Sequence, residues 1–191
     1  MSNKKRYIIV MIISVLMNQG FFMLREACKL PVWLDMTGTA LAALALEPTA
    51  GLMVGLINNF VLAAFYYDDS SLIYYAVSAA VAVIVGTRMR VGGKVKLRRV
   101  FTTVLLVIAV TTVISTVITI WRMGAMPDDY WEIYYYSKAI AIGAPKLIAC
   151  LFGTFVIRLY DTLASVFVVG AFYLLLPKKL KNHMAEIQVS A

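Results

Sequence analysis

The stretch LPVWLDMTGTALAALAL, residues 30–46, decides how this chain must fold. It opens with Trp33 and Asp35 in an apolar setting and then consists almost entirely of Ala, Leu, Gly and Thr. A helix over 33–46 measures roughly 21 Å at about 1.5 Å per residue, short of the roughly 30 Å hydrocarbon core of a bilayer. Such small side chains favour contact with other helices over contact with lipid. We therefore expect this helix to begin below the outer rim of a helical bundle, with Trp33 and Asp35 at the floor of an outward cavity.

The composition around this stretch is that of a membrane protein. Of the 191 residues, 62% are apolar and 15% are charged, against about 45–50% and about 25% in soluble domains. Each apolar run is expected to be a helix, because a lone segment in lipid must satisfy its own backbone hydrogen bonds. No long polar stretch separates the runs, so residues 1–191 are expected to form a single all-α integral membrane domain. Its predicted helices cover 7–24, 33–46, 48–66, 72–87, 100–121 and 160–176.

The basic residues predict the topology. They cluster before the first helix at 4–6, after the fourth at 88–99 and after the last at 178–181. Cytoplasmic loops are enriched in Lys and Arg, and all three clusters are cytoplasmic only if the number of crossings is even. Six crossings with both termini in the cytoplasm satisfy this rule. The segment 122–158 then becomes an outer loop, in which 139–157 is expected to be a partly re-entrant helix rather than a seventh span.

Motifs for catalysis or for cofactors are absent from the sequence. The single histidine, His183, lies in a polar tail, and HExxH, CxxC and a serine nucleophile elbow do not occur. A membrane enzyme would have only Asp128, Asp129 and Glu132 as general acids. The basic loop GTRMRVGGKVK lacks the spacing of an ATP-binding phosphate loop. We therefore predict no enzyme activity, no metal and no cofactor, and we attribute the net charge of +8 to membrane topology rather than to nucleic-acid binding.

The two cysteines are both expected on the outer side of the membrane, where oxidation is possible. Cys28 follows the first predicted helix, and Cys150 lies in the predicted outer loop. The sequence leaves open whether they form a disulfide or are two unrelated thiols.

Aromatic and acidic residues concentrate in two predicted outer regions, 66–75 and 128–136. Tyr and Trp often form an aromatic belt at the membrane interface. Alternatively, aromatic rings and carboxylates form a pocket for a planar or cationic ligand. Polar residues at membrane depth favour the pocket, since an ionisable group in a span costs about 2.5–3.5 kcal/mol, although Arg158 and Asp161 are spaced to pair with each other. The predicted substrate-binding residues are Trp33, Asp35, Asn58, Asn59, Tyr67, Asp68, Tyr75, Trp131, Lys146, Arg158 and Asp161.

Two longer strings, LPVWLDMTGTALAALALEPTAGLMVGLINN at 30–59 and VIRLYDTLASVFVVGAFYLLLPKKL at 156–180, complete the pattern. Together with six helices and cytoplasmic ends, they resemble the S components of energy-coupling factor (ECF) transporters, the ABC-type micronutrient importers of bacteria and archaea. The resemblance implies a multi-pass protein of the bacterial or archaeal cell membrane that captures a vitamin or vitamin-like molecule. It implies a pocket made by the loops 25–35, 66–71 and 122–158.

The resemblance also implies partners besides the lipid bilayer, namely a transmembrane T subunit and two ATPases that use ATP on behalf of the complex. The small residues of the first three helices would meet the T subunit. This chain has Ser14-x-x-x-Asn18 where an Ala-x-x-x-Ala pair is common in the family. The predicted docking residues are Ser14, Asn18, Ala42, Gly51 and Gly55.

The leading hypothesis is therefore a non-enzymatic substrate-capture subunit of an importer. The alternative is a small-molecule-sensing membrane protein that uses the same bundle for signalling, with the basic loop and a short tail as its only cytoplasmic output. The sequence leaves the identity of the ligand open. Aromatic walls favour a planar heterocycle, and the outer acids favour a cation or a hydrogen-bond donor. Lys146 and Arg158 would suit a carboxylate or a phosphate equally well.

Overall fold

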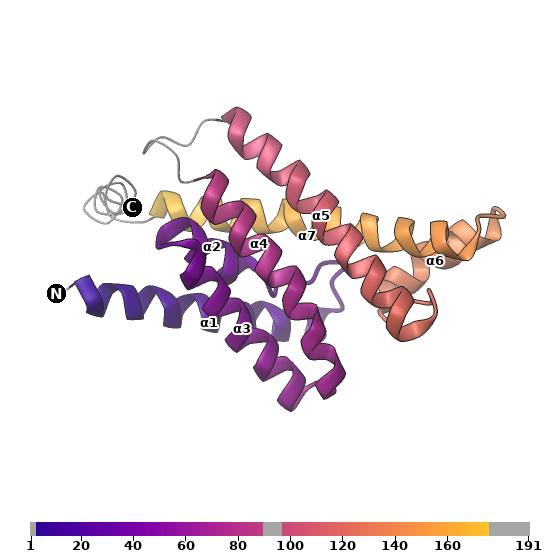
Figure 1. The fold of residues 1–191 in the computed structure, drawn as a ribbon, viewed down its shortest axis with the longest axis horizontal. Helices are drawn as coiled ribbons and strands as arrows, with labels where there is room; N and C mark the ends of the chain where they lie inside the picture. Colours follow the sequence, from indigo (N-terminus) through magenta and orange to yellow (C-terminus); the bar gives the residue numbers. More distant parts are fainter. Residues whose placement is uncertain (1–2, 90–96, 176–191) are drawn as a thin grey trace.

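The computed structural model describes residues 3–89 and 97–175, which form helices and short connections without any strand (Figure 1). Residues 90–96 of the predicted basic cluster at 88–99, the predicted cluster at 178–181 and His183 lie outside these ranges. The elements in chain order are α1 (Asn3–Cys28), α2 (Thr37–Ala45), α3 (Pro48–Phe65), the 3-10 helix η1 (Asp69–Tyr74), α4 (Tyr75–Arg88), α5 (Leu97–Met123), α6 (Tyr130–Ala141) and α7 (Lys146–Leu175).

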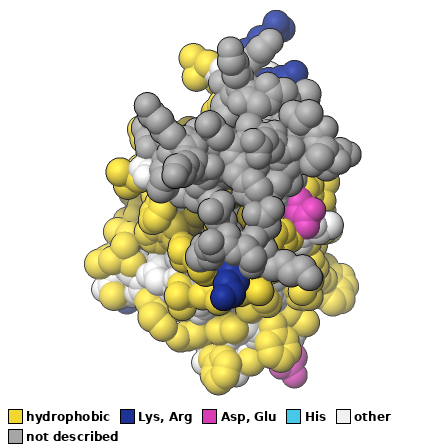
Figure 2. Space-filling view, turned by 90° about the vertical axis from the view of Figure 1, so that its left-hand side faces the viewer, with side chains coloured by type: hydrophobic (Ala, Val, Ile, Leu, Met, Phe, Trp, Pro, Cys, Tyr) yellow, Lys and Arg dark blue, Asp and Glu magenta, His cyan; other side chains and the backbone are white. Residues whose placement is uncertain are grey.

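Five helical segments within the described residues are long and apolar enough to cross a membrane. They are Tyr7–Cys28, Pro48–Phe65, Asp69–Arg88, Leu97–Met123 and Lys146–Phe172. Their outward side chains are apolar, as with Ile8, Ile12 and Leu16 on α1, which are all exposed. Figure 2 shows the end of the molecule at which α1 begins, where hydrophobic side chains make up most of the visible described surface. An apolar surface of this extent is suited to lipid, so the chain is a multi-pass membrane protein.

The predicted helix 33–46 is wrong in its length. The helix that forms, α2, begins only at Thr37 and has nine residues, about 14 Å at the helical rise, so it does not cross a bilayer alone. Residues 29–36 instead form an irregular segment in which Lys29 and Leu34 have positive φ angles of 50° and 56°. In Figure 1 the start of α1 and the last described turn of α7 lie at the same end of the molecule. The irregular segment and α2 are not among the five segments long and apolar enough to cross a membrane, so the predicted second crossing at 33–46 is not found as one helix.

Burial explains the composition of α2. Eight of its nine residues are buried, so its small side chains contact protein on nearly all sides. On α1, the Asn18 side chain accepts a hydrogen bond from the Gly38 backbone N–H (2.6 Å) and donates one to Thr39 Oγ1 (3.1 Å). On the other side, the hydroxyls of Thr37 and Ser165 lie 2.9 Å apart. The helix is thus held between α1 and α7 in the middle of the bundle.

The predicted outer segment 139–157 is also wrong, because it does not form one re-entrant helix. The chain ends α6 at Ala141 and begins α7 at Lys146, with Gly143 at a φ of +88° in the turn between them. Only glycine adopts this conformation without strain. From Lys146 the helix runs unbroken for 30 residues, about 45 Å. The predicted helix 160–176 therefore begins too late, because α7 already starts at Lys146. The pair α6 and α7 projects at the right-hand end of Figure 1.

Candidate functional site

A cavity of about 150 Å³ lies among α3, α4, α5 and α7, and is completed by α6 and the irregular segment before α2. Apolar side chains such as Met36, Leu62 and Val77 form part of its wall. The rest of the wall is polar or aromatic, and six of the predicted substrate-binding residues are among the lining side chains. These six are Trp33, Asp35, Asn59, Tyr67, Asp68 and Arg158.

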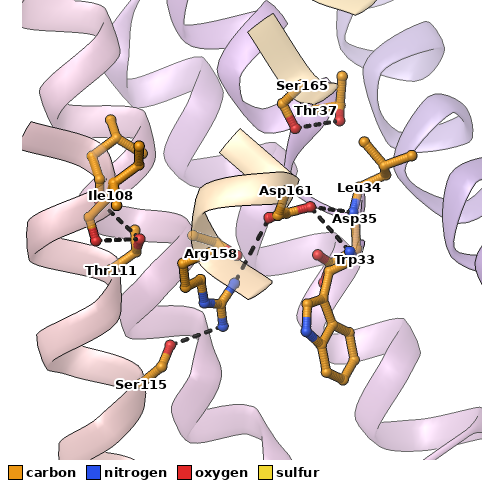
Figure 3. Close-up of polar contacts among 12 residues, drawn as sticks. Trp33, Leu34, Asp35, Thr37, Ile108, Thr111, Ser115, Arg158, Asp161 and Ser165 are labelled. Atoms are coloured by element: carbon orange, nitrogen blue, oxygen red, sulfur yellow. Dashed lines mark hydrogen bonds and ion pairs between the residues drawn. The ribbon is translucent and has the colours of Figure 1, made fainter. Parts of the chain in front are cut away.

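The floor of the cavity depends on Asp161, which is buried on α7 (Figure 3). Its Oδ1 accepts the backbone N–H groups of Trp33 (3.1 Å) and Leu34 (2.6 Å). These bonds fix the strained segment at the point where Leu34 takes a positive φ, a conformation that costs a non-glycine residue of order 1 kcal/mol or more. Asp161 itself lines a second, mostly apolar cavity of about 210 Å³ behind the floor. Its role in the first cavity is therefore to position Trp33 and Asp35.

Arg158, one turn before Asp161 on α7, brings a guanidinium to the cavity wall (Figure 3). It donates to Ser115 Oγ of α5 (2.8 Å) and lies 3.9 Å from Asp161 Oδ2. The predicted pairing of Arg158 with Asp161 is thus present. It occupies one side of the guanidinium and leaves Arg158 Nε without a hydrogen-bond partner among the described residues.

Two further buried atoms in the same wall lack partners within the described chain, namely Trp33 Nε1 and Asp35 Oδ1. A buried donor or acceptor without a partner costs about 1–3 kcal/mol. Such groups are rare in folded proteins and are generally explained by water, strain or a bound ligand. Three of them around one cavity offer two donors and one acceptor to a molecule inside it.

Burial also raises the pKa of the two most enclosed carboxyl groups of the wall. Asp35, in the connection between α1 and α2, has its pKa raised to about 6, chiefly by burial and next by the nearby Asp161 carboxylate. Glu132 on α6 has a raised pKa for the same first reason, opposed by the charge of Arg158. Both groups are therefore more easily neutralised than an exposed carboxylate.

The rim of the site is held together by Arg25, at the C-terminal end of α1. Its guanidinium pairs with Glu26 and with Asp129, and it lies 4.0 Å from the centre of the Trp33 ring. Asp129 in turn caps α6 by accepting the N–H groups of Trp131 (3.1 Å) and Glu132 (3.3 Å). One arginine thus links α1, the segment that carries Trp33 and the start of α6.

A second hollow of about 280 Å³ adjoins the cavity on the side of this rim. The two share Trp33, Tyr67 and Asp128 as lining residues, and the hollow adds Arg25 and Trp131. The hollow therefore adjoins the cavity, with Trp33 and Tyr67 at the boundary between them.

Five predicted substrate-binding residues do not line the cavity. Asn58 is fully buried and donates to the Asp35 carbonyl (3.2 Å), which supports the floor from behind. The Tyr75 hydroxyl lies 3.4 Å from the Leu52 carbonyl, Trp131 lines only the outer hollow, and Lys146 is exposed at the start of α7. Asp161 lies behind the floor, as described above. The sequence indicated the right region but not the direction of each side chain.

Several lining residues were missing from the predicted binding set. Glu132 and Asp128 were predicted as acids of the outer aromatic and acidic region and as general acids of the alternative enzyme, and Arg122 only as the start of the outer loop. Hydroxyl-bearing residues on α5 repeat three or four positions apart, as at Thr112, Ser115 and Thr119, and all three are buried. That spacing predicts a polar face on this helix, and it was the feature of the sequence from which these lining residues could have been predicted. The missed polar and aromatic lining residues are Ser71, Tyr74, Ser78, Ser115, Thr119, Arg122, Asp128 and Glu132.

The predicted docking residues lie inside the chain, so their role as a contact surface is revised. Ser14, Asn18 and Ala42 are completely inaccessible. Gly51 and Gly55 are buried on α3, facing Ala43 and Ser78 respectively. The small side chains let α1, α2, α3 and α4 approach one another, which is the physical use that the sequence pattern signals. A partner would have to contact other side chains.

Gly153 places α6 against α7 and thereby brings Glu132 to the cavity. A Cβ at this position would lie 2.8 Å from the Glu132 carbonyl oxygen and 3.3 Å from the Tyr136 amide nitrogen. Gly153→Ala is therefore expected to push α6 outward and to lower the free energy of unfolding by about 1–3 kcal/mol. Thermal unfolding of the purified protein in detergent measures this loss.

The matched control is Gly170→Ala on the same helix, where a Cβ would meet nothing within 4 Å. Alanine is the better helix former by about 1 kcal/mol, so this variant should be unchanged or more stable. Equal melting temperatures for the two variants would contradict the close packing of α6 on α7.

The cysteines are two separate thiols, with Cys28 exposed and Cys150 buried. Among the described residues, no group of three or more His, Cys, Asp or Glu side chains is arranged to hold a metal ion.

Comparison with protein-family models, with curated proteins and with solved structures finds no match to this chain. The resemblance to S components therefore rests on the strings at 30–59 and 156–180. These strings supply part of the site, since they contain Trp33, Asp35 and Arg158. An adjoining hollow, an aromatic wall and unpaired polar atoms are features typical of small-molecule sites.

Proposed function

We propose that this chain is the substrate-binding subunit of an ECF-type ABC importer. It captures a vitamin or vitamin-like small molecule, planar and heterocyclic, on the outer side of a bacterial or archaeal membrane. It then delivers the molecule through a T subunit and two ATPases. The single observation that carries the proposal is the polar and aromatic cavity within a membrane bundle, where Trp33 Nε1, Asp35 Oδ1 and Arg158 Nε are buried without partners.

The shape of the site supports capture. The outer hollow leads past Trp33 and Tyr67 to the deeper cavity, so a ligand has an entrance and an end point. The floor is formed by Asp35 and Met36, backed by Asp161 and α2. A closed floor suits a subunit that binds a molecule and needs partners to release it, rather than a channel.

The surface of the bundle supports a partner within the membrane. The exposed apolar side chains of α1, including Ile9, Ile13 and Leu16, offer one side to lipid or to another membrane protein. Because the predicted docking glycines are buried on α3, we assign the T-subunit contact to exposed side chains of the bundle.

The experiment that tests the proposal is native mass spectrometry of the tagged protein, extracted mildly from the membranes of its own host. Recovery with a T subunit and two ATPases is the expected result, and a retained small molecule would name the substrate. Recovery with a signalling partner would reject the importer and favour a membrane sensor that uses the same cavity. Repeated recovery alone and without a ligand would reject both the partners and the capture role.

A further inference from the structure

The charges of the cavity wall are unbalanced. Four carboxylates line it, against two guanidiniums. Both guanidiniums are already engaged: Arg122 lies 3.3 Å from Asp68 Oδ1, and Arg158 contacts Ser115 and Asp161. The two most enclosed carboxylates, Asp35 and Glu132, have no ion pair among the described residues. An enclosed negative charge without a partner is unfavourable, so the empty site has an excess of negative charge to neutralise.

The position of Lys146 removes the main reason to expect an anionic ligand. In the sequence, Lys146 and Arg158 together would suit a carboxylate or a phosphate. In the structure Lys146 is exposed at the start of α7 and takes no part in the cavity wall. An anion would then meet two engaged arginines and four carboxylates, which is an unfavourable electrostatic environment.

The volume of the cavity limits the size of the ligand. About 150 Å³ is the volume of a protein cavity that holds one benzene molecule, and it is well below the roughly 300–1,000 Å³ of sites for drug-sized ligands. Three aromatic side chains line the cavity, Trp33, Tyr67 and Tyr74. Arg25 lies over one face of Trp33, and Arg122 lies over one face of Tyr74. Tyr67 and the opposite faces of the other two rings are therefore left to contact a ligand. Trp33 Nε1 and Arg158 Nε are available to an acceptor elsewhere on the same molecule.

We propose that the cavity binds a small organic cation of about one ring in size, whose charged group is neutralised by Asp35 and Glu132. This rests on the proposed capture of a small molecule and narrows its class. The vitamin-like substrate would then be an amine or another protonated nitrogen compound, rather than a carboxylate or phosphate. Its ring would lie against Trp33 and the neighbouring tyrosines.

The test uses three probes of nearly equal size, which are benzylamine, benzyl alcohol and benzoate. Their binding to the purified full chain is measured at neutral pH by tryptophan fluorescence and by thermal stabilisation. Benzylamine is expected to bind at least about tenfold more tightly than the other two, since a hydrogen bond between an ammonium and a carboxylate is stronger than one between neutral groups. Benzoate binding as tightly as benzylamine, or no binding of benzylamine, would overturn the proposal.

Substitutions test whether Asp35 and Glu132 are the carboxylates that contact the ammonium group of benzylamine. Asp35→Asn and Glu132→Gln should each lower benzylamine affinity about tenfold while leaving benzyl alcohol unaffected. Asp69→Asn is the matched control, because Asp69 is exposed and does not line the cavity. Unchanged benzylamine affinity in both cavity variants would overturn the assignment. If a variant fails to fold, the relative affinities of the three probes for the unaltered chain still test the proposal.

The pH dependence gives an independent readout. Asp35 faces Asp161 and Arg158 of α7 and Arg25 of α1, and its pKa is raised to about 6, first by burial. Above that pH the carboxylate is ionised and attracts the amine, and below it the neutral acid does not. Benzylamine stays protonated throughout, so its affinity should fall as the pH drops below about 6 and level off near the roughly tenfold loss expected for Asp35→Asn, at about pH 5 and below, with benzyl alcohol unaffected. A constant benzylamine affinity down to about pH 5 would contradict the role of Asp35.

These outcomes separate the two proposals. A preference for benzylamine without any ECF partners in native mass spectrometry would leave a cation site on a protein that is not an importer subunit. Recovery of the partners without a preference for benzylamine would keep the importer and reject the cation.

Discussion

Replacing Gly38 by alanine is expected to destroy the packing of the bundle. A Cβ at this position would lie 1.9 Å from the Ser14 carbonyl oxygen and 2.7 Å from its carbon, both backbone atoms of α1. It would also lie 2.8 Å from Asn18 Oδ1, the acceptor of the Gly38 N–H. The two contacts with the Ser14 backbone cannot be relieved by a change of rotamer, so α1 and α2 would have to separate. We expect a loss of about 3 kcal/mol in the free energy of unfolding, at the upper end for overpacked sites.

Gly20→Ala on α1 is the matched control for this variant. Its Cβ would meet nothing within 4 Å, so it should be neutral or stabilising through helix propensity. Thermal unfolding of the two purified variants in the same detergent gives the comparison. Equal melting temperatures for Gly38→Ala and Gly20→Ala would show that α2 is not held against α1 as described.

The second large effect is expected at Asp161. Asp161→Ala removes the acceptor of the Trp33 and Leu34 N–H groups and the counter-charge of Arg158, all at once. Breaking a buried ion pair from one side costs about 3–5 kcal/mol, because the remaining charge stays buried. Leu34 would also lose the bond that holds its positive φ. The protein should therefore melt at a lower temperature and lose binding in the outer cavity, although Asp161 is not a lining residue of that cavity.

Asp161→Asn separates the two contributions. The amide keeps an acceptor oxygen for the backbone but not the charge, so its loss of stability should lie between that of alanine and zero. Asp69→Ala on the exposed η1 is the control and should stay within about 0.5 kcal/mol of the unaltered chain. Chemical-denaturant or thermal unfolding measures all three. If Asp161→Ala is as stable as Asp69→Ala, the floor of the site does not depend on this carboxylate.

The polar residues around the floor of the cavity have two different roles. Arg158 and Asp35 contribute atoms to the cavity, whereas Asp161 and Asn58 hold the backbone that carries Trp33 and Asp35. A substitution scan that measured only ligand binding would report all four as binding residues. Comparing stability with binding distinguishes the residues that touch a ligand from those that position the floor.

The sequence by itself determined that the chain is a multi-pass helical membrane protein and where most of its helices run. This follows because each long apolar run must satisfy its own backbone in lipid. It also determined the region of the site, since Trp33, Asp35 and Arg158 are costly in an apolar setting and need a reason to be there.

Only the tertiary structure decided which way the side chains face. The start of α2 at Thr37 depends on Asp161, a residue far along the chain that binds the preceding backbone. The break between α6 and α7 turns Lys146 to the outside and Glu132 to the cavity. The rotation of each helix, and hence the burial of Gly51 or Asn18, is fixed by close contacts between distant segments. Local periodicity cannot specify these contacts, because in lipid both faces of a helix are apolar and only packing against other helices distinguishes them.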